Sequence, residues 1–254
     1  MKSLLRAALI FAGLCLVWQA VVTIFGLPAY ILPPPTRVLA ALVQRADFLA
    51  ANALLTLAEI VLGMICGILL GCLSALTLAS LPTARRWLLP VLVVSQAIPV
   101  FALAPLLVLW FGYGMASKVA AATIIIYFPV TSAFFDGLRH TERGWLDLAR
   151  VMGATSRREL LLLRAPAALP GLASGVRLAA AVAPIGAIIG EWVGASAGLG
   201  YVMLQANARM QIDVMFAALL VLGLVAVALY YAVDATLRHF IPWLPESLSL
   251  SSKE

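Results

Sequence analysis

Long apolar runs with almost no charge are the feature that most constrains what this chain can fold into. A helix of about 20 apolar residues, rising ~1.5 Å per residue, crosses the ~30 Å hydrocarbon core of a bilayer. The mean hydropathy of +1.06 and a charged fraction of only 11% agree with such spans. We therefore predict an all-α polytopic membrane protein, one domain over residues 1–254, with six transmembrane helices at 7–25, 54–78, 88–111, 119–135, 172–194 and 214–233.

Prolines and glycines give these runs different characters. The third run contains Pro90, Pro99 and Pro105, and a proline inside a helix removes a backbone hydrogen bond. Membrane helices tolerate such breaks only where protein or a cavity satisfies the freed backbone groups, so we expect this span to be kinked. The second run carries a row of small residues that should let another helix approach closely. That row is Gly63, Gly67 and Gly71, and the fifth run has a similar series of Gly186, Gly190, Gly194 and Gly198.

The basic residues indicate how the chain is oriented. The net charge of +6 is compatible with nucleic-acid binding, but the seventeen Lys and Arg residues form no dense tract with interleaved aromatic side chains. With six spans and both termini in the cytoplasm, thirteen of them, Lys253 included, face inward, as the positive-inside rule requires. The four that face outward are Arg37, Arg45, Lys118 and Arg209. We predict cytoplasmic termini and no nucleic-acid partner.

One polar stretch, residues 136–171, interrupts the apolar runs and is predicted to be cytoplasmic. Asp147 is expected in the first turn of a short helix, Gly153 at a bend, and Ser156 at the cap of a second helix. A short, stiff helix with a defined corner suits a contact that transmits force. The alternative is a basic amphipathic loop that rests on anionic lipid headgroups.

The chain lacks the phosphate-binding sequence of an ATPase. No Gly-Lys pair occurs, so the G-x-x-x-x-G-K-[ST] pattern is absent. His140 and His239 lie outside the apolar runs, and no Cys/His cluster has the spacing of a metal site, so we predict no catalytic residue and no metal. If the chain is a transporter, it needs either a separate ATPase or an ion gradient as its energy source. The third possibility is a purely structural membrane scaffold.

The polar stretch carries a spaced motif that resembles the cytoplasmic Glu-Ala-Ala loop of the membrane subunits of binding-protein-dependent ABC importers. The motif reads Asp147-Leu148-Ala149, three residues, Gly153, nine residues, Leu163, one residue, Ala165-Pro166. Four positions differ from the family pattern: this chain has Asp147 where the family has Glu, Leu148 where it has Ala, Leu163 where it has Ile, and Ala165 where it has Leu. The resemblance implies that the ATPase-coupling residues are Asp147, Ala149, Gly153, Ala154, Thr155, Arg157 and Pro166.

The resemblance extends from about residue 31 to residue 243. Three stretches look like the nitrate/sulfonate/taurine-type permeases: residues 31–35 (ILPPP), 109–114 (LWFGYG) with Ser117-Lys118, and 190–201 (GEWVGASAGLGY). Within that group, residues 96–101 (QAIPVF) and 206–211 (ANARMQ) look most like permeases for the thiamine precursors hydroxymethylpyrimidine and formylaminopyrimidine.

The family resemblance implies a fold, partners and a location. We expect the type I ABC importer permease fold, a homodimer in the bacterial inner membrane, and a separate ATP-binding subunit that carries the ATP and magnesium. A periplasmic or extracellular solute-binding protein would deliver the substrate, and surrounding lipid would contact the spans. No cofactor is expected in this chain.

Three polar residues in the apolar runs are candidates for the substrate pathway: Glu59, Gln96 and Glu191. Buried acids are costly in a bilayer, so neither glutamate should face lipid, and a structural role for each is as plausible as a pathway role. Acids near a pathway favour a neutral or cationic nitrogen heterocycle over nitrate, taurine or a sulfonate. The rival hypothesis is an ion-coupled carrier or channel in which Glu59 and Glu191 relay protons.

Overall fold

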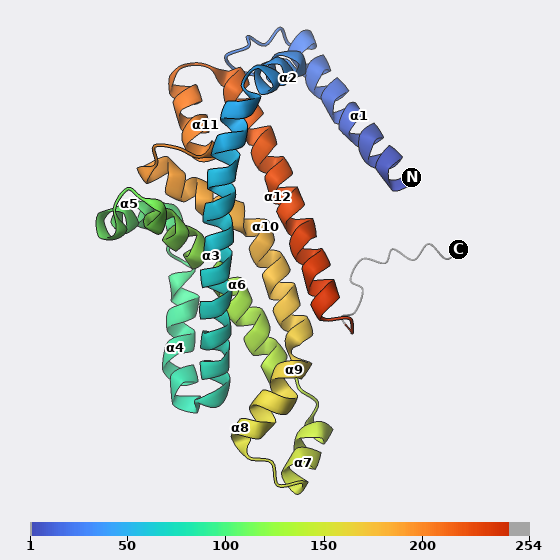
Figure 1. The fold of residues 1–254 in the computed structure, drawn as a ribbon, viewed down its shortest axis with the longest axis vertical. Helices are drawn as coiled ribbons and strands as arrows, with labels where there is room; N and C mark the ends of the chain where they lie inside the picture. The colour runs from blue at the N-terminus through green and yellow to red at the C-terminus, as the bar shows by residue number, and fades with distance from the viewer. Residues whose placement is uncertain (1, 244–254) are drawn as a thin grey trace. The chain divides into compact units, whose positions relative to one another are not determined.

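The computed structural model describes residues 2–243, with side chains from residue 9 onward except that of residue 11. This part of the chain consists of helices and connecting turns without a strand, which confirms the all-α prediction (Figure 1). The predicted position of Lys253 and of the C-terminus lies outside the described residues. The helices are α1 (Lys2–Ile24), α2 (Pro35–Gln44), α3 (Ala46–Ser80), α4 (Pro82–Ser95), α5 (Val100–Phe111), α6 (Met115–Arg139), α7 (Arg143–Val151), α8 (Ser156–Arg158), the π-helix η1 (Glu159–Arg164), α9 (Ala165–Ala167), α10 (Leu169–Gly194), α11 (Leu199–Ala208) and α12 (Ile212–Phe240).

Four of the predicted spans coincide with single long helices. Within the described residues, α3, α6, α10 and α12 are long and apolar enough to cross a membrane. The first predicted span corresponds to α1, whose apolar part, Ala12–Ile24, is shorter. Counting the broken pair α4 and α5 as one span gives five, so the total of six remains a prediction.

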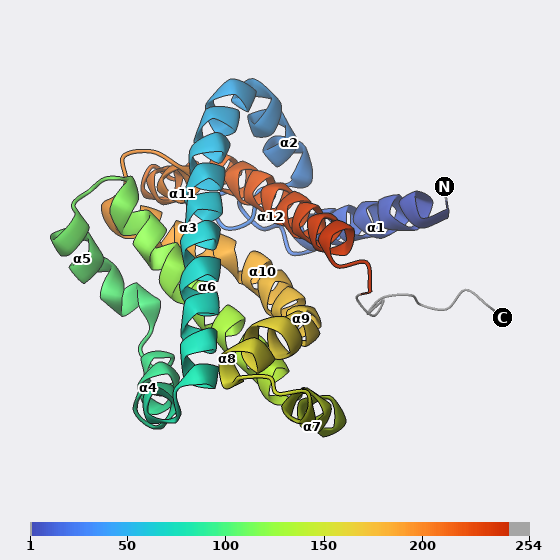
Figure 2. The ribbon, with the colours of Figure 1, turned by 60° about the horizontal axis from the view of Figure 1, so that its bottom comes forward.

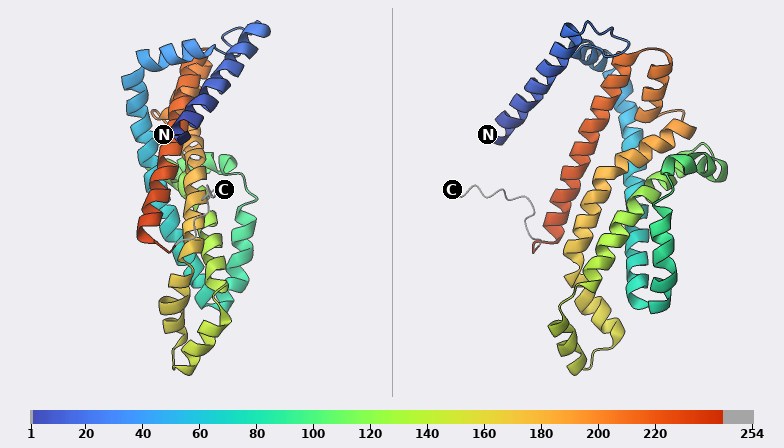
Figure 3. Two further views of the ribbon diagram at one scale, coloured as in Figure 1. Left: turned by 90° about the vertical axis from the view of Figure 1, so that its right-hand side faces the viewer. Right: turned by 180° about the vertical axis from the view of Figure 1, so that it is seen from behind.

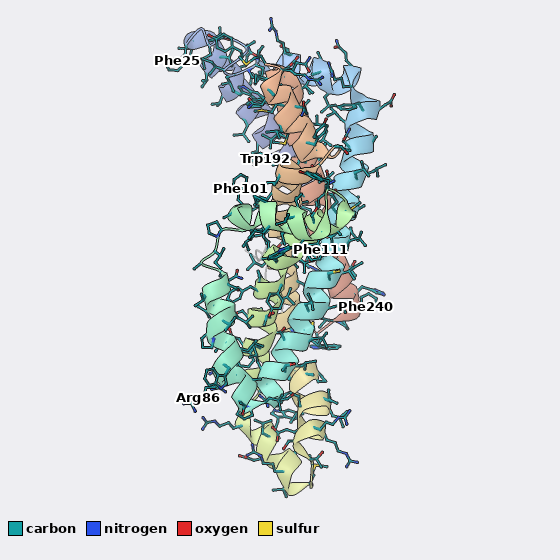
Figure 4. The ribbon with its side chains drawn as sticks, turned by 90° about the vertical axis from the view of Figure 1, so that its left-hand side faces the viewer. Phe25, Arg86, Phe101, Phe111, Trp192 and Phe240 are labelled. Carbon is teal, nitrogen blue, oxygen red and sulfur yellow. The ribbon has the colours of Figure 1, made fainter. Side chains whose placement is uncertain are left out.

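The third predicted span is broken into α4 and α5, which meet at an angle of 102°. Pro99 is the N-cap of α5, so the break falls at one of the three prolines that predicted it. Figure 4 shows the result: α5 crosses the direction of α4, and its aromatic side chains Phe101 and Phe111 project from it. The expected kink is therefore confirmed, and it is sharp enough to form two helices.

Contacts divide the chain into two compact units. One contains Met1–Leu57 and Ala195–Val225, and the other contains Ala58–Gly194 and Ala226–Glu254. Helices α3 and α12 each contribute a segment to both units.

In the unit that contains residues 58–194, the predicted glycine row of α3 packs directly against α6. A Cβ atom added at Gly63 would lie 2.5 Å from Ala122 Cβ, and one added at Gly67 would lie 2.6 Å from Ile126 Cγ2. Contacts this close require glycine. The row continues with Gly71 against Val130, so residue numbers rise together along both helices and α3 and α6 run parallel (Figure 2).

Helix α10 packs on α6 through its own glycines, in the opposite direction. A Cβ atom at Gly186 would lie 2.6 Å from Ala122 Cα, and one at Gly190 would lie 2.9 Å from Lys118 Cα. Nearer the start of α10, Gly175 approaches Pro129 O. The numbers fall on α6 as they rise on α10, so the two helices are antiparallel neighbours, as both views of Figure 3 show.

An apolar core lies among these three helices. The close contacts between the helices leave little space there, and small side chains fill it. Methyl-rich side chains dominate it, and its fully or nearly fully buried members are Ile60, Met64, Ala122, Ile126, Val130, Val176, Ala179, Ala180, Ala183 and Ala187. The unit is thus held by backbone-to-backbone approach as much as by side-chain burial.

In the other unit, a polar face of α3 caps the start of α11. Gly198 N donates to Asn52 Oδ1 at 2.7 Å, and Leu199 N donates to Thr56 Oγ1 at 2.9 Å. Gly198 adopts a φ of +110°, which a side chain would strain. Two of the orphan amides at this helix terminus are therefore satisfied from a helix far away in the sequence.

The glycine contacts predict opposite effects for two Gly→Ala substitutions. Gly186→Ala should lower the free energy of unfolding by about 1–3 kcal/mol, because its methyl group would collide with the backbone of Ala122. Gly223→Ala on α12 meets nothing within 4 Å and should be neutral or stabilising by about 0.5–1 kcal/mol. Thermal unfolding of both variants in detergent measures the difference; equal stability would contradict the close packing.

Candidate functional site

The polar stretch forms a compact segment of short helices, α7 to α9 (residues 143–167), which we call the coupling segment. It follows the C-terminal end of α6 and precedes α10 (Figure 1). Helix α7 has no buried residue, and it exposes apolar side chains beside its charged ones. Leu148, Val151 and Met152 are 57%, 86% and 78% exposed, which is unusual for side chains of this type in a polar segment.

Asp147 is the fifth residue of α7, so the prediction that it lies in the first turn is wrong. The helix begins at Arg143, earlier than the motif alone indicates. Asp147 is exposed, and its Oδ1 accepts a hydrogen bond of 3.2 Å from Arg150 Nη1. Arg150 Nε also lies 3.6 Å from Glu159 Oε2, so this arginine connects α7 with the helix on the other side of the corner.

Gly153 forms the corner, as predicted, with a φ of +77°. Its amide donates to Arg150 O, and Ala154 N donates to Ala149 O, both at 2.9 Å. These two bonds are the Schellman arrangement that ends a helix at a left-handed residue. The geometry explains why Gly153 occurs at the corner, because this residue must be left-handed, while Ala149 and Ala154 contribute backbone groups that close the turn.

The second helix is capped by Thr155, one residue before the predicted cap Ser156. Thr155 has extended backbone angles, and its Oγ1 accepts a hydrogen bond from Arg158 N at 3.4 Å. Either hydroxyl is suitable chemically, so the sequence alone does not separate them. Ser156 is instead the first helical residue, and the exposed Arg157 follows it.

Pro166 is the second residue of α9, which directly follows a π-helical stretch, Glu159–Arg164. A proline lacks an amide proton and collides with the carbonyl four residues earlier, and a wider π-turn accommodates both effects. Arg164 Nε donates to Leu138 O at 3.0 Å, which ties this stretch to the end of α6. The coupling segment is therefore attached to α6 both covalently and through a side chain.

Glu59 and Glu191 are brought together with Lys118 in one buried cluster. Lys118 Nζ lies 3.0 Å from Glu59 Oε1, and Glu191 is close enough to Glu59 to interact with it electrostatically. The three residues are only 1%, 8% and 1% exposed for Glu59, Lys118 and Glu191. They come from α3, α6 and α10, the same helices that the glycines hold together.

Sequence reasoning counted Lys118 among the outward-facing basic residues and missed this contact. Lys118 is the fourth residue of α6, and it is buried. The spacing contained a usable signal. Gly63 and Ala122 are in contact, Glu59 lies four residues before Gly63, and Lys118 lies four residues before Ala122. One helical turn before the Gly63–Ala122 contact, the same register of α3 and α6 therefore places Glu59 beside Lys118.

A second ion pair that sequence reasoning missed joins α10 to α12. Arg177 and Asp234 form a mostly buried contact in which Arg177 Nε lies 2.6 Å from Asp234 Oδ1. Arg238 Nε donates to the other oxygen, Asp234 Oδ2, at 2.9 Å, and its side chain is half exposed. The carboxylate therefore has a cation on each side.

Gln96 is exposed at the C-cap of α4, in the break before α5. Its Nε2 donates to Ser95 Oγ at 3.4 Å, which is a weak contact. None of the contacts described for residues 2–243 joins Gln96 to Glu59 or Glu191. A substrate-pathway role for these three residues remains a prediction.

Comparison with known proteins identifies the kind of protein that this arrangement belongs to. Residues 60–244 match the family described as "Binding-protein-dependent transport system inner membrane component". The chain is 54% identical over 94% of its length to a probable ABC transporter permease protein of Haemophilus influenzae, covering 97% of it. It is 36% identical to the formylaminopyrimidine transport permease protein ThiX of Halalkalibacterium halodurans, covering 94% of this chain and 96% of ThiX.

A third relative and a solved structure complete the comparison. The riboflavin transport system permease protein RibX of Chloroflexus aurantiacus is 36% identical, covering 89% of this chain and 85% of RibX. The inward-facing MetNI methionine ABC transporter has the same fold, with a TM-score of 0.67 at 21% identity, covering 77% of this chain and 97% of that one.

The fold is that of a multi-pass membrane permease, the type I ABC importer fold. The chain belongs to the binding-protein-dependent transport system inner membrane component family, and it is the permease subunit of an ABC importer.

The buried cluster predicts a large and non-additive response to substitution. Lys118→Met should lower the free energy of unfolding by about 3–5 kcal/mol, because the buried Glu59 carboxyl group would lose the cation that pairs with it. The double variant Glu59→Gln/Lys118→Met should recover part of that loss. Arg238→Gln, at a half-exposed pair, should cost less than about 1 kcal/mol and serves as the control. Additive losses measured by thermal unfolding in detergent would show that the pair is not coupled.

Proposed function

We propose that two copies of this permease form the pathway through which an ATP-driven importer moves a small nitrogen heterocycle into a bacterial cell. The class of heterocycle is that of the pyrimidine precursors of thiamine. A separate ATP-binding subunit binds the coupling segment on the cytoplasmic side, and a solute-binding protein delivers the substrate on the other side. This orientation follows the positive-inside distribution of Lys and Arg.

The observation that carries the proposal is the shape and surface of the coupling segment. Helix α7 exposes Leu148 and Val151, its C-cap residue Met152 is exposed too, and the corner at Gly153 sets the direction of the helix. An apolar patch on a segment otherwise rich in charge is typical of a protein interface. The segment is thus suited to fit into a groove of a partner protein, and the family is one whose members depend on such partners.

The contacts around the coupling segment supply a path for force. Arg150 links α7 to Glu159 across the corner, and Arg164 links the following stretch to Leu138 at the end of α6. Helix α6 is in turn packed against α3 and α10 through glycines. A movement of the ATPase at α7 would therefore displace a three-helix block, which is what alternating access requires.

The substrate class is supported by two relatives and by charge. ThiX is named as a transport permease for formylaminopyrimidine and RibX as one for riboflavin, and both compounds are nitrogen heterocycles. The buried cluster contains two carboxylates, Glu59 and Glu191, and one cation, Lys118. Because the two carboxyl groups lie beside only one cation, the cluster offers no surplus of positive charge to an anion such as nitrate, taurine or a sulfonate.

A glycine substitution at the corner tests the coupling. Gly153→Pro should weaken the retention of the partner ATPase by at least about tenfold, or 1.4 kcal/mol, because proline fixes φ near −65° and removes the amide that donates to Arg150 O. Gly144→Ala on α7 meets only the end of the Glu142 side chain and should retain the ATPase. Co-purification of the pair in detergent measures both. Equal retention for wild type and Gly153→Pro would refute the coupling role.

The substrate class has its own test. Cells that express the importer should take up a labelled aminopyrimidine, and excess unlabelled formylaminopyrimidine should compete, whereas taurine and nitrate should not. Ligand binding to the partner solute receptor, measured by calorimetry, should rank the compounds in the same order. Competition by taurine and not by formylaminopyrimidine would contradict the heterocycle as the substrate class and would indicate a sulfonate.

A further inference from the structure

A cavity of about 700 Å³ lies between the cytoplasmic end of α3 and the coupling segment. Its lining has two different parts. One is apolar and includes Leu76, Ala79 and Leu161. The other holds three guanidinium groups, from Arg150, Arg157 and Arg164, and one carboxylate, from Glu159. We call it the arginine cavity.

The arginines are not all neutralised by the protein. Arg150 is paired with Asp147 and Glu159, and Arg164 uses its Nε on Leu138 O. Arg157 has no hydrogen-bond or ion-pair partner within residues 2–243. Three cations against one carboxylate in the lining leave an excess of positive charge that attracts an anionic group.

The cavity lies where the protein could contact both the headgroup and an acyl chain of a phospholipid. Helix α3 is a candidate membrane span, and Leu76 and Ala79 belong to its last turns, near the proposed cytoplasmic boundary. Leu161 is 47% exposed and continues the apolar wall on the other side of the cavity. Basic pockets at this level between membrane helices match anionic headgroups, with acyl chains along the apolar wall.

We propose that the arginine cavity binds an anionic phospholipid of the inner leaflet, with its phosphate on Arg157 and Arg164 and an acyl chain against Leu76 and Leu161. Such a lipid would bridge α3 and the coupling segment, and its occupancy would affect how firmly the ATPase-binding helix is held. The inference rests on the proposed function through the cytoplasmic placement of this segment.

The test uses the full permease with its ATPase, incorporated into vesicles of phosphatidylglycerol and phosphatidylcholine and then extracted. Native mass spectrometry counts the lipids that each complex retains. Phosphatidylglycerol should be retained in preference to phosphatidylcholine, and added inorganic phosphate should not displace it, because the acyl chain contributes to binding. Displacement by inorganic phosphate would identify a free-anion site and would overturn the proposal.

Two matched pairs of variants locate the lipid. Arg157→Gln should reduce the affinity for phosphatidylglycerol by about fivefold, whereas Arg143→Gln on α7, which lies outside the cavity lining, should not. Leu161→Asp should expel the lipid, whereas Leu162→Asp, its exposed neighbour outside the lining, should not. Equal losses within either pair would show non-specific surface binding and would overturn the proposal.

The ATPase serves as an internal readout that separates the two claims. If the ATPase is retained but phosphatidylglycerol is not preferred, the lipid inference fails while the coupling role stands. If phosphatidylglycerol is preferred but the ATPase does not bind, the coupling role fails. If the permease alone retains phosphatidylglycerol but its complex with the ATPase does not, the cavity belongs to the protein interface and the lipid proposal is overturned.

Discussion

The close approach of α6 to α3 and α10 is the constraint on which the rest of the structure depends. Glycines on the outer two helices let their backbones approach α6 to distances that no side chain permits. That spacing places Lys118 beside Glu59 and Glu191 at one end of the block. Buried charges of this kind persist only when geometry is fixed around them, so the glycine rows and the ion cluster depend on each other.

The same block gives the coupling segment something rigid to act on. Helix α6 carries the Lys118–Glu59 pair at its start and the Arg164 contact at its end, so under the proposed coupling a displacement at α7 would be passed along a helix that is held on two sides. The Schellman turn at Gly153 fixes the direction of the corner, and Arg150 lies 3.6 Å from Glu159 across it. The sharp α4–α5 break lies beside this block as a separate, irregular element.

Sequence reasoning succeeded where a residue type has one physical use. The glycine row of α3, the proline break and the bend at Gly153 were all predicted, because each depends on backbone geometry that few residues permit. It failed where alternatives were chemically equal, as with Thr155 and Ser156 at the cap. It also missed the ion pairs of Lys118 and Arg177, since a charged side chain on a helix can face water or a partner on another helix, and only tertiary packing decides.

The central claim is that a separate ATPase moves this permease. Proteoliposomes that contain the permease, its ATPase and its solute receptor test the claim by comparing uptake of labelled heterocycle with ATP inside, without ATP, and with the proton gradient collapsed by an ionophore. If a separate ATPase drives the permease, uptake requires ATP and survives the ionophore. Uptake that persists without ATP and stops when the gradient collapses would contradict it and would make Glu59 and Glu191 a proton relay instead.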